Sequence, residues 1–169
     1  MRIDQRERVL RKELRKLLPV DKNDVAAIEA ITAHGYPGVQ PILLDLLKWI
    51  RDESWPVAKP AREFLATIGP RLAPQVREVL GSRDDPWKAI VLRQIVSEWP
   101  SEDVRGLSDQ LFLIATHGQS WGADLLALRL LARHAIGDPE WIAGWLEFKQ
   151  EHHEKRLSEI AEIIRMLPG

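Results

Sequence analysis

The 169-residue chain contains no cysteine. Disulfides, thiolate nucleophiles and cysteine-ligated metals are therefore excluded. The sequence also lacks an apolar run of about 20 residues, the length needed to span a bilayer. Its first residues lack the apolar stretch of a secretory signal. From these absences we expect a cytoplasmic protein that is not embedded in a membrane.

Strand-like segments, with alternating apolar and polar residues, are missing as well, so we expect an all-α fold. The composition, 45% hydrophobic and 29% charged, is that of a globular protein large enough to bury its own core. A net charge of -1 gives no general excess of Lys and Arg for nucleic-acid phosphates. Binding of nucleic acid is not favoured, although local basic patches leave it open.

A repeated Asp-x-x-Trp pattern is the main internal feature of the chain. It occurs at residues 52–55, 84–87 and 138–141, and Trp121 follows Trp87 by 34 residues. A period of about 33 residues with two helices per unit is typical of α-solenoids of the HEAT, armadillo and tetratricopeptide group. The tryptophan, glycine and tyrosine spacing of tetratricopeptide repeats is absent. The pattern therefore predicts a HEAT-like α-solenoid of stacked antiparallel hairpins with about 8–9 helices.

We expect one domain over residues 1–169, with a capping helix at about 5–18, repeat hairpins at about 23–136 and capping helices at about 139–167. The first helix has leucines on one face and Arg or Lys on the other. Its basic face is either a solvated side or a binding arm for an acidic partner. Other predicted helices span about 39–51, 87–98 and 122–136. One more begins at Pro56, and another begins with the cap Ser101-Glu102-Asp103 and continues to about Ile114.

Part of the chain resembles a known family, over about residues 17–99. The residues that carry the resemblance are Leu18-Pro19-Val20-Asp21-Lys22, Pro41, Leu47, Trp49, Trp55-Pro56-Val57-Ala58, Pro60, Asp85 and Trp87-Lys88. The family is an uncharacterised bacterial one of small HEAT-like proteins, known only as a domain of unknown function. The resemblance implies an all-helical HEAT-like fold and supplies no catalytic residues.

The repeated tryptophans have two interpretations. At the start of each second helix they suit packing anchors between hairpins, whereas exposed rings would suit ligand platforms. Asp52, Asp84 and Asp138 are interpreted as link or capping residues. The run Glu151-His152-His153-Glu154 does not predict a metal site, because adjacent helical residues point about 100° apart. We expect no catalytic residue, metal or cofactor.

A partner-binding surface is predicted where the second helices of the hairpins line a concave face. Cations outnumber acids among the polar residues of these helices, which favours an acidic partner surface. The alternative is that these residues are only the solvated sides of helices. We call the candidates the second-helix surface: Lys59, Arg62, Glu63, Trp87, Lys88, Arg93, Arg129 and Arg133.

These observations favour a non-enzymatic module that binds a protein through the second-helix surface. One concrete form is an immunity or inhibitor protein that masks the active site of a bacterial toxin. A rival hypothesis is a DNA-binding HEAT-like enzyme of the alkylpurine DNA glycosylase type, with Asp84, Trp87, Trp121 and Arg129 as first candidates. A third is a scaffold that uses its convex or capping surface. The sequence does not fix the oligomeric state.

Overall fold

The computed structural model describes residues 2–117 and 122–166, and side chains from Arg8 onward. These residues form helices and turns with no strand among them, as predicted. The helices are α1 (Arg2–Leu14), α2 (Val25–His34), α3 (Leu43–Leu47), α4 (Ala58–Ile68), α5 (Ala73–Leu80), α6 (Asp85–Gln94), α7 (Ser101–Arg105), α8 (Ser108–His117), α9 (Ala123–Arg133) and α10 (Pro139–Met166).

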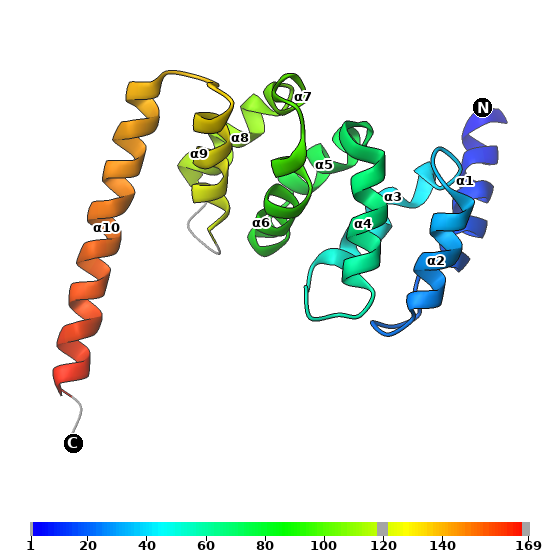
Figure 1. The fold of residues 1–169 in the computed structure, drawn as a ribbon, viewed down its shortest axis with the longest axis horizontal. Helices are drawn as coiled ribbons and strands as arrows, with labels where there is room; N and C mark the ends of the chain where they lie inside the picture. The colour runs from blue at the N-terminus through cyan, green and yellow to red at the C-terminus, as the bar shows by residue number, and fades with distance from the viewer. Residues whose placement is uncertain (1, 118–121, 167–169) are drawn as a thin grey trace.

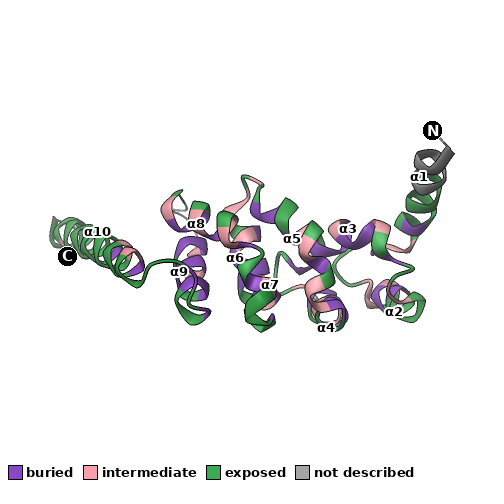
Figure 2. Cartoon of the chain, turned by 90° about the horizontal axis from the view of Figure 1, so that it is seen from above, coloured by how far each residue is buried: buried purple, intermediate pink, exposed green. Residues whose placement is uncertain are grey.

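Successive helices follow one another along an elongated molecule, with α1 at one end and α10 at the other (Figure 1). Seen from above, α1, α3, α5 and α8 lie along one side, and α2, α4 and α9 along the other (Figure 2). Contacts follow the same order: α3 with α5 and α5 with α8, then α2 with α4 and α6 with α9. Each helix therefore packs mainly on near neighbours.

The core is one apolar cluster that extends along the molecule, from Leu14 in α1 to Ile142 in α10. Buried residues lie on the inward faces of the helices in both rows (Figure 2). Ile28, Leu65 and Leu92 are among its fully buried members. Because a single short helix buries only one face, packing against neighbours supplies most of the stability.

Aspartates cap helices where the sequence predicts it. The Asp84 carboxylate accepts a 3.0 Å hydrogen bond from the backbone N–H of Trp87, in the first turn of α6. Asp138 accepts one from the N–H of Glu140 at 3.0 Å, at the start of α10. Asp52 instead stabilises the turn before α4, because its carboxylate accepts a 2.9 Å hydrogen bond from the backbone N–H of Ser54. The repeated aspartates therefore fill two different local roles.

The prolines shift two predicted helix boundaries. α4 begins at Ala58 and not at Pro56, so Pro60 falls in the first turn. A backbone N–H has no partner within the helix at that position, so a proline is tolerated there. The predicted helix at about 39–51 is instead a 3-10 turn at Gln40–Ile42 that contains Pro41, then α3, then a second 3-10 turn at Lys48–Ile50.

Two further predictions about helix length are wrong. Where one helix was expected after Ser101, Gly106 separates α7 from α8, as the poor helix propensity of glycine allows. The two C-terminal capping helices are a single helix, α10. Residues 149–156 contain neither Gly nor Pro, so nothing in the sequence ends the helix there. Within residues 2–117 and 122–166, no helix is long and apolar enough to cross a bilayer.

Candidate functional site

The second-helix surface carries fewer accessible cations than its sequence suggests. Lys88 is only 13% exposed, and its ammonium lies 3.0 Å from the carboxylate of Asp85 in the same helix. Arg93 pairs at 2.8 Å with Glu53, which comes from the link before α4. Lys59 is well exposed, and Glu63 stays 4.0 Å away from it. The structure therefore pairs two of the predicted cations, Lys88 and Arg93, closely with acids and leaves Lys59 accessible.

Three cations of this surface remain available to a partner. Lys59 and Arg129 are exposed, and Arg62 is half-buried. Arg133 is exposed too, but donates a 3.2 Å hydrogen bond to the backbone carbonyl of Ser97. Because α4 and α9 bear these residues, the charge is spread along the row and not gathered at one point. The second-helix surface stays a prediction.

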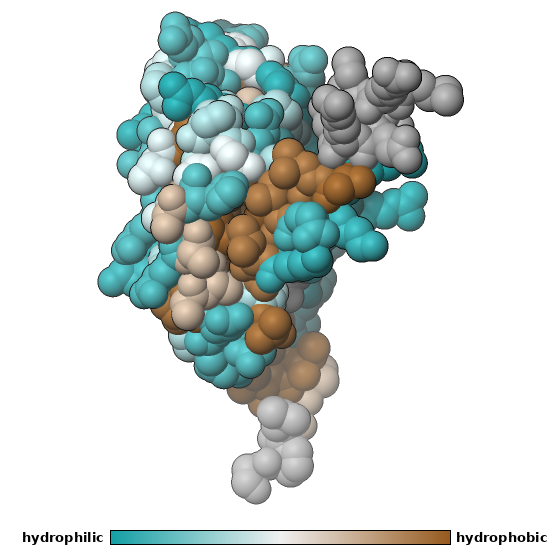
Figure 3. Space-filling model, turned by 90° about the vertical axis from the view of Figure 1, so that its right-hand side faces the viewer, coloured by the Kyte–Doolittle hydropathy of each residue, from teal (hydrophilic) through white to brown (hydrophobic). Residues whose placement is uncertain are grey.

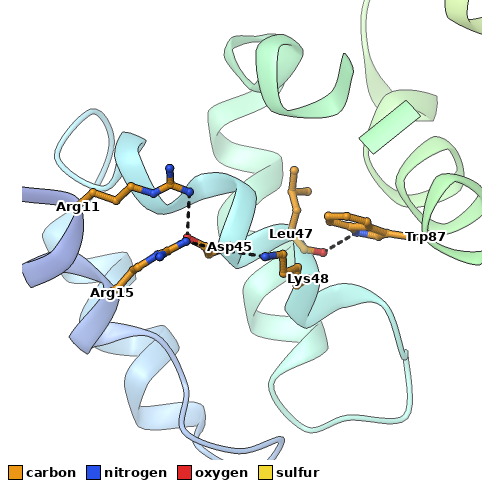
Figure 4. Close-up of polar contacts among 6 residues, drawn as sticks. All are labelled: Arg11, Arg15, Asp45, Leu47, Lys48 and Trp87. Carbon is orange, nitrogen blue, oxygen red and sulfur yellow. Dashed lines mark hydrogen bonds and ion pairs between the residues drawn. The ribbon is translucent and has the colours of Figure 1, made fainter. Parts of the chain in front are cut away.

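Trp87 is a packing residue, as the repeat pattern predicts, and its burial leaves little of the ring for the partner contact that was also predicted for it. Its side chain is 8% exposed, and its indole N–H donates a 3.0 Å hydrogen bond to the backbone carbonyl of Leu47 (Figure 4). The guanidinium of Arg51 lies 5.3 Å from its ring centroid and forms an ion pair with Asp84. Trp87 and Asp84 thus take part in local packing and pairing. Trp121 lies outside the described residues.

A cluster of charges around Asp45 joins α1 to α3 and was missed from the sequence. The Asp45 carboxylate accepts hydrogen bonds from Arg15 at 2.8 and 3.2 Å and from Lys48 at 3.1 Å, while Arg11 lies 3.5 Å away (Figure 4). Three cations therefore face one carboxylate, and two positive charges of the cluster are in excess.

The pKa of Asp45 reflects two opposing effects. Burial of the side chain by itself raises the pKa of this carboxyl, but the hydrogen bonds and charges of Arg15 and Lys48 outweigh it. The pKa consequently lies below its ordinary value, and the group is ionised at neutral pH. Asp45 is thus a stable anionic anchor for the surrounding cations.

An open pocket of about 570 Å³ adjoins this cluster. Trp49 and Trp55 are half-buried in it, with ring centroids 6.0 Å apart and ring planes at 60°. Lys48 and Arg51, with side chains 50% and 44% exposed, bring positive charge to the lining. We call this cavity the Trp49–Trp55 pocket; it is lined by Leu18, Pro19, Asp45, Lys48, Trp49, Arg51 and Trp55.

One sequence signal could have indicated this site. Asp45 stands between leucines in the segment Leu43-Leu44-Asp45-Leu46-Leu47. An acid in an otherwise buried stripe requires a partner, because carboxylates are almost never buried unpaired. The sequence alone did not show that Arg11 and Arg15 are these partners, because 34 and 30 residues separate them from Asp45.

Among the described residues, the C-terminal helix α10 contacts the rest of the protein through its first turns. Phe112 of α8 meets Trp141 edge to face, with centroids 4.9 Å apart. The Lys149 ammonium lies 2.5 Å from the Asp124 carboxylate in a pair that is nearly buried. Beyond Lys149 most side chains are exposed, including five large apolar ones: Leu157, Ile160, Ile163, Ile164 and Met166.

Apolar side chains are exposed at the opposite end as well. Figure 3 shows an apolar patch on the face that contains α1. Val9, Leu10 and Val20 are exposed, although the leucine pattern of the first helix predicts that Leu10 packs inward. Among the described residues, no group of three or more histidine, aspartate and glutamate side chains is placed to hold a metal ion.

A family model described as a domain of unknown function (DUF5071) matches residues 17–125. The chain belongs to this family. All lining residues of the Trp49–Trp55 pocket fall within the matched region of the family, whereas α10 lies beyond it. No curated protein matches the chain.

Proposed function

We propose that this protein is a HEAT-like α-solenoid that works as a non-enzymatic interaction module and binds a protein partner. The observation that carries the proposal is the exposed apolar face of α10, with Leu157, Ile160 and Ile164 about one helical turn apart. Contiguous exposed apolar side chains are a mark of protein interaction sites. The row of helices gives such a module its extended surface.

Charge gives the partner a chemical character. Lys59, Arg62 and Arg129 are the accessible cations of the second-helix surface. They favour a partner with an acidic surface, mainly by steering its approach. Asp84 is occupied as a helix cap and as the ion-pair partner of Arg51, which favours binding over the base-excision role considered for it.

Masking a toxin is the concrete form of this function that we propose. An immunity protein needs a stable fold, an extended complementary surface and no chemistry of its own. The identity of the gene beside the one that encodes this chain tests that version directly. A toxin gene in that position supports it, and a consistently different neighbour contradicts it.

Co-purification from the cells that make the protein tests the general proposal. The full-length tagged chain is compared with two variants, Lys59→Glu/Arg62→Glu/Arg129→Glu and Leu157→Glu/Ile160→Glu/Ile164→Glu. These residues are exposed or half-buried, so the helical circular dichroism and the unfolding temperature of both variants should stay near the wild-type values.

The expected result is a specific co-purified protein that is lost with one of the two variants. The variant that loses it identifies the surface that binds. A wild-type chain with no co-purified protein, or a co-purified set that both variants retain, contradicts the proposal.

A further inference from the structure

We infer that the Trp49–Trp55 pocket binds an apolar side chain flanked by carboxylates, presented by an acidic segment of the partner protein. The inference rests on the proposed function and adds a defined contact to it. It is independent of α10 and of the second-helix surface, because the pocket is lined by other residues.

The apolar part of the pocket is suited to a side chain. Leu18 and Pro19 line it together with the two tryptophans, whose rings meet at 60° and so form a corner. An aliphatic or aromatic side chain inserted there covers both half-buried rings. Large rigid aromatic residues in such positions are typical anchors of protein interfaces.

The charges around the pocket select what flanks that side chain. The single negative charge of Asp45 balances one of the three cations around it, so two positive charges of the cluster remain. Lys48 is half exposed, so its ammonium can turn towards a partner carboxylate. Arg51 contributes less, because Asp84 already pairs with it. Carboxylates beside the inserted side chain complete the charge balance of the cluster.

The same features favour a protein segment over a nucleic acid. Bases stack on parallel aromatic faces, and two rings at 60° do not form a continuous platform for successive bases. A phosphate backbone also needs a run of cations, whereas the pocket lining contributes two, Lys48 and Arg51, and Arg51 already pairs with Asp84.

Nuclear magnetic resonance of the tryptophan indole N–H groups tests the inference on the full-length protein. The peaks are assigned with single Trp→Phe variants, and the probe is the end-blocked peptide Glu-Glu-Leu-Glu-Glu. The comparison ligands are Glu-Glu-Ser-Glu-Glu, Lys-Lys-Leu-Lys-Lys and a short oligothymidylate. We expect the leucine peptide to move the Trp49 and Trp55 peaks saturably, and to leave those of Trp141 and Trp145 in place.

The variant Lys48→Gln should weaken this binding about two- to fivefold, the effect of one exposed ion pair. Lys155→Gln, which removes an exposed cation of α10 outside the pocket, is the matched control and should leave the affinity unchanged. The wild-type peak shifts decide the matter even if a variant folds poorly.

Several results overturn the inference: no movement of the Trp49 and Trp55 peaks, equal binding of the serine or lysine peptide, or tighter binding of the oligothymidylate. An equal loss of affinity with Lys48→Gln and Lys155→Gln does so as well. If the peptide fails while co-purification succeeds, the pocket assignment is wrong and the interaction function stands.

Discussion

The indole N–H of Trp87 and the backbone carbonyl of Leu47 are joined by a 3.0 Å hydrogen bond across 40 residues of sequence. The bond connects the first turn of α6 to the last residue of α3. Trp87 therefore holds α6 against α3 through both its ring and its single donor.

Replacing Trp87 with Phe should remove about 1–3 kcal/mol from the free energy of unfolding, because a buried carbonyl loses its side-chain donor. Trp99→Phe is the control, since Trp99 is 5% exposed and its indole makes no hydrogen bond among the described residues. Urea unfolding measures both variants. A loss at position 87 no larger than at position 99 would show that packing alone accounts for the role of Trp87.

Asp45→Asn should destabilise the protein by about 1–3 kcal/mol at pH 7, because the cations around it lose their carboxylate. This loss of unfolding free energy is smaller than that expected for a fully buried ion pair, because the side chains of Arg15 and Lys48 are about half exposed.

The pH dependence of this effect has a definite sign. The folded-state pKa of Asp45 lies below its ordinary value, so the contribution of Asp45 is complete above the unfolded pKa of about 3.9 and is lost as the pH falls through the folded pKa. Urea unfolding of wild type and Asp45→Asn at pH 7 and pH 3 checks it. A difference between the two proteins that does not shrink at pH 3 contradicts the assignment.

His134 should make the protein less stable as the pH falls below about 6.5, the ordinary pKa of histidine. Burial, and then the positive charges of Arg133 and Arg105, lower the pKa of its imidazole in the folded state. The unfolded chain therefore takes up the proton first, and stability declines until the pH reaches the folded pKa.

The variant His134→Gln should lose this pH dependence. Glutamine does not titrate, and its amide can replace the 2.9 Å contact between the imidazole Nδ1 and the Ser101 hydroxyl. Unfolding free energies between pH 5 and 7.5 provide the measurement. Equal slopes for His134→Gln and wild type would assign the pH dependence to another group.

Gly137→Ala should destabilise the protein by about 1–3 kcal/mol, the cost of a strained backbone at a non-glycine residue. Gly137 has a φ of 86°, and an added Cβ would lie 2.5 Å from the ring of Phe112. Gly144→Ala is the matched change inside α10, where nothing lies within 4 Å of the added Cβ.

Because alanine is the better helix former, Gly144→Ala should stabilise the protein by about 0.5–1 kcal/mol. Thermal unfolding of the two variants should shift in opposite directions. A shift of the same sign would mean that the link between α9 and α10 adapts to a side chain.

Local features of the fold were predictable from the sequence, because they depend on residues a few positions apart. The cap at Asp84 and the absence of strands follow from neighbouring residue types. The breaks at Gly106 and around Pro41 were missed, since an apolar stripe continues past both and only packing decides whether the helix does.

The candidate sites depended on long-range convergence and could not be predicted in the same way. Nothing local to Asp45 indicates that Arg15 faces it. The number of cations in the sequence of α6 is larger than the number that a partner can reach, because Glu53, in the link before α4, pairs with Arg93. For α10, Leu157 and Ile164 follow a helical period that predicts a packing face, but the described part of this chain supplies nothing that covers them.

The attachment of α10 through its first turns also gives the helix a mechanical property. From Lys149 to Met166 the helix extends by about 25 Å, at 1.5 Å per residue, with its fixed end at the Asp124–Lys149 pair. A molecule bound near Met166 would exert a torque on the Asp124–Lys149 pair, because it binds far from the attached end of the helix. Force applied near Met166 is therefore transmitted to the ion pair with α9, to the aromatic contact with Phe112 of α8 and to the packing of Ile142 in the core.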